Sequence, residues 1–536
     1  MPRARTNPGS RALVPGWQTM RVIVRGTQLL LPDGLSASGA ADVLASEIPI
    51  VTQRAHVLER TFWDSFDGRV HAAGLALIDS AGGLSLADAT TYAEVARGAK
   101  LGRAQRVLVD DLPPGDLRAQ LEPLLKMRAL TPIARVRSRM LPIGVLDDEG
   151  KTVVRLRVEE ASTRLDSETS TALRPRLHLT GVRGYDDELE RLRALLVGSL
   201  GLTEAVRPVQ DDAVAAAGGT PGGISSKLRV KLRAEQRADG AAVVVLRDLL
   251  TTIEVNLPGT LADVDSEFLH DLRVSVRRTR ALQRELSKVF PPEPLRCFRD
   301  DFKELQQVTG PTRDLDVQLL EFGELERDLP ATSAPDVAPL RALLADHRSA
   351  EQRKMVRALR SEPVRVVLRD WSAFLEDLTD APTTDRPDAA RPIGDVAGHR
   401  IAKVYKRMVK MGRAIDDASP HEALHDLRKQ GKELRYLLEF FSSLYPADVV
   451  KPMVGSLKSL QDVLGRFQDC EVQADQLRSL GDEVAALDGG AAALMAMGVL
   501  VERLHDDQHA ARDQFAERFA RFATAEQREI VKRTFT

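Results

Sequence analysis

The spacing of hydrophobic residues changes once along this chain of 536 residues, and the change divides it into two regions. Residues 21–204 contain short β-rich runs separated by turns; examples are RVIVRGTQLLL, GRVHAAGLALI, KTVVRLRVEEA and RLHLTGVRG. Many short strands in a row predict an antiparallel sheet, folded as a barrel or meander. From Lys227 onward apolar residues recur at helical spacing. The expected fold class is therefore α+β, with a β-rich domain followed by an all-α domain.

Three segments interrupt these patterns. Residues 205–226, AVRPVQDDAVAAAGGTPGGISS, are rich in Gly, Pro and Ala and predict an interdomain linker. Residues 379–395, TDAPTTDRPDAARPIGD, divide the helical region 227–536 into halves 227–378 and 396–536. Residues 1–20 hold arginines but no hydrophobic signal core, so we expect a disordered lead, with Met1 or Met20 as the start.

The two helical halves repeat one another. At an offset of 155 residues, which places His270 over His425, EFLHDLR (267–273) lies over EALHDLR (422–428) with a single difference. The match continues without a gap: Arg277 meets Lys432, Arg280 meets Arg435, Lys303 meets Lys458, Gly310 meets Gly465 and Asp314 meets Asp469. Agreement of this kind at one offset indicates an internal duplication.

The repeated helix carries a basic face. At 100° per residue, one arc holds His270, Arg273, Arg277, Arg280 and Arg284 in the first half, and His425, Arg428, Lys432 and Arg435 in the second. The helix before the second copy repeats the spacing with Arg400, Lys403, Arg407 and Lys410. A solvated face usually alternates acids and bases, because like charges three or four residues apart repel. Stacked bases favour a site for a multivalent anion such as phosphate. The two histidines fit either a structural role or contact with the ligand.

A competing motif occurs in the same segment. His421-Glu422-Ala423-Leu424-His425 reads as H-E-x-x-H, the helical zinc motif of many metalloproteases. His421 falls on Ser266 in the first copy, however, and no third ligand follows. Ser419-Pro420-His421-Glu422 instead predicts a capping box, with Ser419 as the N-cap and Glu422 reaching back to its amide. We therefore expect no metal at this helix.

Charge and composition limit which classes of protein the chain can belong to. The net charge is −2, so any cationic site is local. Two cysteines exclude a disulfide framework and fit a reducing compartment. The longest uncharged apolar run, residues 489–501, is shorter than the ~20 residues that span a bilayer. A cytoplasmic protein without a membrane segment is expected.

With these motifs, residues of about 225–530 resemble the CHAD family, the conserved-histidine α-helical domains. That family has two four-helix bundles related by a pseudo-twofold, and each half carries H-x-x-R-x-x-x-[RK]-x-x-R followed by L-G-x-x-x-D-x-x-V. Here the second segment reads Thr309-Gly310, Asp314 and Val317 in the first half, with Thr in place of Leu, and Leu464-Gly465, Asp469 and Val472 in the second. The resemblance implies binding of inorganic polyphosphate in a basic cavity, without catalysis or cofactor. The residues expected to line it are those of the three basic faces together with Lys303 and Lys458.

RTFWDSFDGRVHAAGLALI and LTPIARVRSRMLPIGVL resemble, more weakly, the CYTH domain that often precedes CHAD. Active CYTH enzymes begin with E-x-E-x-K and hold metal ions against a triphosphate. Here RVIVRGTQLLL has no acid and EIPIVTQR has one Glu, so a degenerate, catalytically silent tunnel is expected. Glu159 and Glu160 are candidate metal ligands, although a solvated strand end is preferred. Residual anion binding is assigned to Arg135, Arg137 and Arg139, which alternation places on one face, and to Arg155 and Arg157.

Three functions follow. The leading expectation is non-enzymatic polyphosphate binding, which would target the protein to polyphosphate granules. A metal-dependent triphosphatase in residues 21–204 is one alternative. Nucleic-acid binding is the other, and it is disfavoured because the basic helices carry few aromatics for base stacking, chiefly Tyr405 and Tyr436. Protein partners and oligomeric state are left open.

Overall fold

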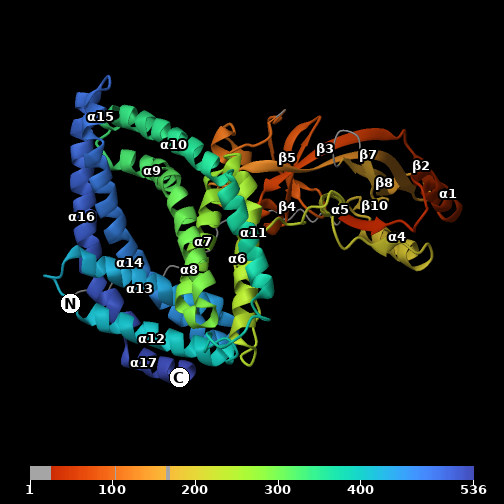
Figure 1. Ribbon diagram of the computed structural model, residues 1–536. Coiled ribbons are helices and arrows are strands. Elements are labelled where there is room, and N and C mark those ends of the chain that lie inside the picture. Colours follow the sequence, from red (N-terminus) through yellow and green to blue (C-terminus); the bar gives the residue numbers. More distant parts are fainter. Residues whose placement is uncertain (1–25, 103, 165–169) are drawn as a thin grey trace, which may run out of the picture. The chain divides into compact units, whose positions relative to one another are not determined.

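The computed structural model describes residues 26–102, 104–164 and 170–536, which divide between Ser225 and Ser226 into two compact units (Figure 1). The expectations for residues 1–20, a disordered lead and a choice of start, lie outside the described residues. Among the described helices, none is both long and apolar enough to cross a membrane.

The first unit is built on an antiparallel sheet, as predicted, but the sheet is open. Its strands are β1 (Gly26–Leu30), β3 (His56–Ser65), β4 (Leu75–Ser80), β5 (Gly83–Asp88), β6 (Glu94–Gly98), β7 (Leu130–Leu146), β8 (Thr152–Arg164), β10 (Arg176–Gly181) and β11 (Thr203–Glu204), with the short strands β2 (Ile50–Thr52) and β9 (Ser170–Ala172) pairing with β7 and β8. The order is β11-β1-β10-β8-β7-β3-β4-β5-β6. Among the described strands β6 and β11 are edges and do not pair with each other, so the expected barrel does not close.

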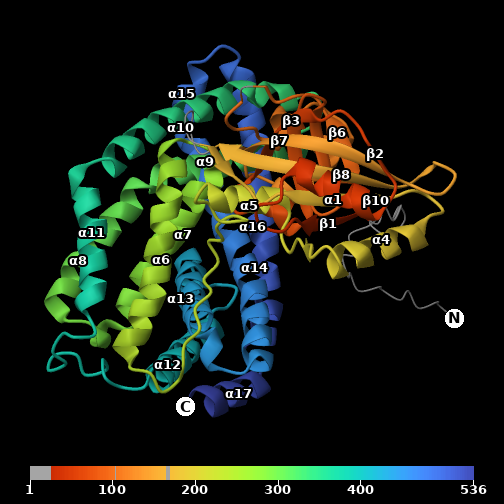
Figure 2. The ribbon, with the colours of Figure 1, turned by 90° about the vertical axis from the view of Figure 1, so that its right-hand side faces the viewer.

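Helices cover both faces of the sheet (Figure 2). On one face α1 (Ala37–Glu47) and α4 (Asp186–Gly198) pack against leucines and valines of β1, β8 and β10, and α3 (Asp116–Leu125) packs against β4 and β5. On the opposite face α5 (Val209–Ala216) buries Val209, Ala213 and Val214 against Phe62, Val136 and Ala161. The arginines Arg135, Arg137 and Arg139 are exposed at alternate positions of β7, on one face as predicted.

Helix α5 corrects the interpretation of residues 205–226 as a linker. The apolar stripe of α5 is short and is not apparent in the sequence, because Ala and Gly residues surround it. In the structure Val209 and Ala213 are completely buried. The residues after it are also held to the first unit, since the Ile224 amide donates to the Phe66 carbonyl at 3.0 Å. The chain passes close to Gly68, whose φ is 67°. A Cβ at this position would lie 2.0 Å from the Gly222 carbonyl oxygen, so glycine leaves the space that this contact needs. The boundary is therefore a point near Ser226.

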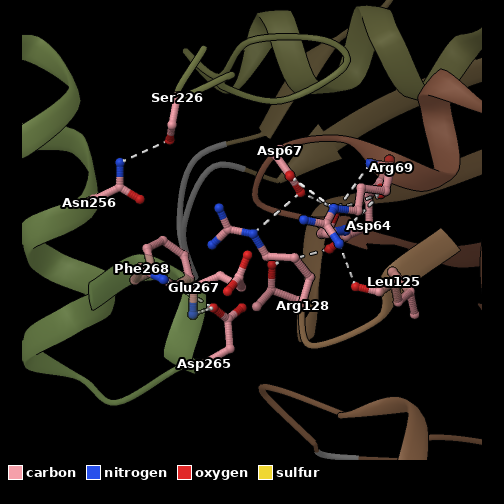
Figure 3. Close-up of polar contacts among 12 residues, drawn as sticks. Asp64, Asp67, Arg69, Leu125, Arg128, Ser226, Asn256, Asp265, Glu267 and Phe268 are labelled. Atoms are coloured by element: carbon pink, nitrogen blue, oxygen red, sulfur yellow. Dashed lines mark hydrogen bonds and ion pairs between the residues drawn. The ribbon is translucent and has the colours of Figure 1, made fainter. Parts of the chain in front are cut away.

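Buried carboxylates shape the loop after β3. Asp64, which is 3% exposed, accepts the amides of Val70 and His71 at 2.9 Å each and so holds the short helix α2 (Arg69–Ala72). Figure 3 shows Asp67 beside Arg69 and Arg128, with Oδ2 and Nε of Arg69 2.9 Å apart. Burial raises the pKa of Asp64, and the backbone amides oppose that rise. The segment Trp63-Asp64-Ser65-Phe66-Asp67 therefore ends β3 in a turn that Asp64 stabilises.

The second unit is entirely helical in the residues described. The first half contains α6 (Ala238–Leu261), α7 (Ser266–Glu285), α8 (Pro292–Val308), α9 (Gly310–Asp328), α10 (Ala338–Leu359) and α11 (Glu362–Asp377). The second contains α12 (Ile393–Arg413), α13 (His421–Phe440), α14 (Ala447–Ser479), α15 (Gly481–Ala485), α16 (Gly490–Phe522) and α17 (Ala525–Phe535). Helices α6, α7, α8 and α11 form one bundle around Trp371, and α12, α13, α14 and α16 form its counterpart.

The two copies differ where α8 meets α9. Pro311 is the second residue of α9, and proline disfavours a continuous helix because it lacks an amide hydrogen. The equivalent position holds Arg466, and there α14 continues for 33 residues. The ends of α9 and α10 pack against α14 and α16 through a separate core that includes Phe322, Leu344 and Leu477.

The helix starts also differ between the copies. Asp265 caps α7 by accepting the amides of Glu267 at 2.9 Å and Phe268 at 3.2 Å (Figure 3). The predicted capping box of α13 is wrong. Pro420 is the N-cap and offers no side-chain acceptor, while Ser419 Oγ hydrogen bonds to Asp416. The Ser419 hydroxyl therefore stabilises the turn before α13 and does not cap the helix.

Candidate functional site: the facing basic helices

The repeated basic helices α7 and α13 lie against each other, so residues 155 positions apart in sequence meet in space. Two cross-contacts fix the pair. Arg278 of α7 forms an ion pair with Glu439 of α13, and its guanidinium lies 5.9 Å from the ring centre of Tyr436. The duplicated faces therefore form one cluster of charge.

Arg277 and Lys432 occupy the centre of this cluster. Both side chains are half-buried, and neither has a hydrogen bond or an ion pair to any residue that the structure describes. Burial, followed by the positive charges of Arg428 and Arg277, lowers the pKa of Lys432 to about 8, against the opposing effect of Asp469. An ammonium that is destabilised in this way gains free energy from a bound anion. These two residues are the strongest anion-binding candidates in the helical unit.

Arg273 has a different role from its neighbours on the same face. It is 8% exposed, and its Nη1 donates to the Gln306 carbonyl at 2.9 Å and to Thr309 Oγ1 at 3.0 Å. These are contacts at the last turn of α8, where helical carbonyls lack partners within the helix. Burial, followed by the charge of Arg277, lowers the pKa of Arg273 to about 10. Arg273 therefore positions the α8–α9 junction while adding its charge to the cluster.

Two acids neutralise the far end of the α7 face, one from α7 itself and one from α13. Glu285, which is 5% exposed, pairs with Arg284 at 3.1 Å and with Arg400 of α12, and Glu433 of α13 pairs with Arg284 at 2.9 Å. The expectation of bases without acids is wrong at this end, because Glu285 directly follows Arg284 on α7 and Glu433 reaches Arg284 from α13. Arg280 contacts Gln306, and burial lowers its pKa.

The α13 face is also partly paired. His425 Nδ1 contacts Gln468 of α14, Arg428 Nη2 lies 3.1 Å from Asp469 Oδ1, and Arg435 Nε lies 3.5 Å from Glu439 Oε1. His421 Nδ1 contacts Glu471 Oε1 at 3.0 Å. His270, the counterpart of His425, is half-buried on α7.

The remaining predicted cations are exposed on other helices of the unit. They are Lys303 of α8, Lys458 of α14, and Lys403, Arg407 and Lys410 of α12. Burial raises the pKa of Glu433, and the positive charge of Arg407 partly opposes that rise. Arg407 is therefore close enough to add its charge to the cluster. The sequence did not single out Arg313 of α9, whose charge lowers the pKa of Arg273 and whose Nη1 donates to the Ser266 carbonyl at 3.3 Å. Its repeat partner is Gln468, so the duplication gave no signal for it.

In the first unit, the preference for a solvated strand end at Glu159 is wrong. Glu159 is fully buried, forms an ion pair with Arg60 and contacts His178 Nε2 at 2.6 Å and Ser138 Oγ at 2.6 Å. The hydrogen bond from His178 and the charge of Arg60 hold its pKa well below the usual range despite burial. Glu160 accepts the Ala37 amide at 2.7 Å and pairs with Arg139 at 3.0 Å. The described residues contain no group of three or more His, Cys, Asp or Glu arranged to hold a metal ion.

Comparison with known proteins places the facing helices in a family. The sequence profile of the CHAD domain matches residues 244–478. Two uncharacterized proteins of Mycobacterium tuberculosis, from strains CDC 1551 / Oshkosh and ATCC 25618 / H37Rv, are 29% identical over 217 residues. That match spans 39% of this chain and only 39% of each relative.

Two solved structures are also similar. The CHAD domain from the plant Ricinus communis has 22% identity and a TM-score of 0.43, over 57% of this chain and 96% of that one. PptA from Streptomyces chartreusis has 18% identity and a TM-score of 0.42, over 53% of this chain and 99% of that one. On the family profile, together with the repeated helices α7 and α13 inside it, this chain contains a CHAD domain, carried by its helical unit at residues 244–478.

Proposed function

We propose that the helical unit binds inorganic polyphosphate without catalysis, through the facing basic surfaces of α7 and α13. The observation that carries the proposal is the pair Arg277 and Lys432: two half-buried cations, one from each repeat, that repel each other and form no hydrogen bond or ion pair with the described residues. Like charges held together cost free energy unless an anion joins them. Such binding would target the protein to polyphosphate granules.

The surrounding charges favour a chain over a single phosphate. Arg273 and Arg313 extend the cluster toward α9, Arg428 extends it along α13, and Arg407 extends it toward α12. A flexible polyanion contacts several such groups at once and releases counterions as it binds. Affinity should therefore rise with chain length and fall steeply with salt.

Nucleic-acid binding is less well supported by the same surface. Of the aromatics on the basic helices, Tyr405 is 3% exposed and Tyr436 is 7% exposed, so neither ring is available to stack on a base. Competition between polyphosphate and single-stranded DNA at matched salt separates the two. Preferred binding of DNA would contradict the proposal.

A triphosphatase in the first unit is also disfavoured. Glu159, one of its two candidate ligands, already has Arg60 and His178 as partners inside the sheet. Phosphate release from tripolyphosphate with Mg²⁺ or Mn²⁺, lost in Glu160→Gln, would favour the enzyme instead.

The direct test is titration of the full chain with long-chain polyphosphate. Arg277→Ala combined with Lys432→Ala should weaken binding at least ~10-fold, because each removed cation forfeits charge-assisted contacts. The matched control is Arg353→Ala with Arg357→Ala, which removes the same charge from two exposed residues of α10. Equal losses in both variants, or affinity independent of chain length, would overturn the proposal.

A further inference from the structure

A row of four side chains crosses the centre of the sheet in the first unit. Strand register places Asp79 of β4 opposite Thr61 of β3, Thr61 opposite Arg135 of β7, and Arg135 opposite Arg164 of β8. Directly opposed residues of antiparallel strands project from the same face. With strands about 4.8 Å apart, the row is about 15 Å long. It lies on the face of α1, α3 and α4, opposite to the face that α5 covers.

The row lines an open cavity of about 530 Å³. Lys100, Ser80 and Gly102 complete the wall beside the aspartate, and Arg137 and Glu59 lie one step along the strands. The cavity therefore has a cationic end and a carboxylate end, both within the first unit.

The cationic end has an excess of positive charge. Like charges directly opposite in neighbouring strands destabilise a sheet. Neither Arg135 nor Arg164 forms a side-chain hydrogen bond or an ion pair with a residue that the structure describes. The other two arginines of β7 on this face are paired, Arg137 with Glu59 at 3.7 Å and Arg139 with Glu160 at 3.0 Å. Among the described residues, the unpaired cations of this cavity are thus the exposed residues Arg135 and Arg164, with Lys100 beside the aspartate.

The carboxylate end lacks a donor. Asp79 Oδ1 is shielded from solvent, and no hydrogen bond reaches it from the described residues. A buried acceptor left without a donor costs roughly 1–3 kcal/mol in typical proteins. A ligand that brings a hydroxyl or amino hydrogen to this end would offer the Asp79 carboxylate a donor.

We propose that this row binds a small molecule that carries a phosphate group and also a hydroxyl or amino group, as nucleotides and sugar phosphates do. The phosphate lies between Arg135 and Arg164, and the donor group points to Asp79. Inorganic polyphosphate fits less well, because at neutral pH it offers acceptors only and the Asp79 carboxylate repels it. The site is separate from the surface of α7 and α13 and does not depend on its function.

The test measures binding of ATP, glucose 6-phosphate and tripolyphosphate to the full chain by calorimetry. ATP or glucose 6-phosphate should bind more tightly than tripolyphosphate. Whichever of these two binds more tightly shows whether the site takes a nucleotide or a sugar phosphate. Arg135→Gln with Arg164→Gln should weaken that binding at least ~10-fold. Arg139→Gln is the control, since it removes an exposed arginine of the same strand and face that already has a partner.

A second variant tests the donor. Asp79→Ala should weaken binding of the hydroxyl-bearing ligand but leave tripolyphosphate unchanged or improved. Binding of long-chain polyphosphate is measured for each variant as well, because it reports whether the helical unit is intact. A loss of ligand binding at the row is thereby distinguished from a loss of polyphosphate binding by the helical unit. Absence of binding by ATP and glucose 6-phosphate, an equal loss in Arg139→Gln, or an Asp79→Ala effect shared by tripolyphosphate would overturn the proposal.

Discussion

Raising the pH from 7 to 9 should weaken polyphosphate binding through one side chain, Lys432. Burial and the nearby charges of Arg428 and Arg277 lower its pKa to about 8 in the free protein. A bound polyanion favours the ammonium and raises that pKa. The complex therefore holds more protons than the free protein above pH 8, so affinity falls as the pH rises.

The size of the effect follows from the titration of a single group. With a pKa of about 8, the charged fraction of Lys432 falls from roughly nine-tenths at pH 7 to roughly one-tenth at pH 9. If polyphosphate raises the pKa above 9, the observed affinity falls ~10-fold over this interval, or ~1.4 kcal/mol. Arg273, with a pKa of about 10, titrates above the interval.

Calorimetric titration at pH 7, 8 and 9, at constant ionic strength and in buffers of different ionisation enthalpy, measures both affinity and proton uptake. Lys432→Arg is the matched control, because a guanidinium keeps its charge throughout this range. It should bind with little dependence on pH and without proton uptake near pH 8. A parent protein with a flat profile, or a variant with the same decline as the parent, would refute the reasoning.

Three further predictions concern stability. Arg273→Ala should lower the free energy of unfolding in urea by about 1–3 kcal/mol, because the end of α8 loses its donor, whereas Arg277→Ala should change it by less than about 0.5 kcal/mol; equal effects would contradict the separate roles. Trp371→Ala should cost about 3–5 kcal/mol, since the ring is fully buried against three phenylalanines, and an unchanged urea midpoint would contradict this packing. Glu159→Gln should cost about 3–5 kcal/mol at pH 7 by leaving Arg60 without its buried counterion. Since folding depresses the pKa of Glu159, the stabilisation exists above the unfolded pKa and is lost at lower pH, so the difference in Tm should shrink below about pH 4.

Much of the helical unit could be predicted because its signals are local. The 3.6-residue spacing of apolar positions predicts helices at α7 and α13, and the duplication identifies them as equivalent. The sheet of the first unit was predictable for the same reason. Local pattern failed at α5, whose eight residues are too short and too rich in Ala to stand out from a linker.

The sequence by itself determined which residue types share a helix face and that the face occurs twice, since both depend only on spacing along the chain. Only the tertiary structure decided which of those charges are neutralised. Arg284 forms ion pairs with Glu285, its neighbour on α7, and with Glu433 of α13, and Arg273 donates to the Gln306 carbonyl of α8. Arg277 and Lys432 face each other because α7 packs on α13. Electrostatic free energy depends on distance and burial in space, and neither quantity is a property of one helix.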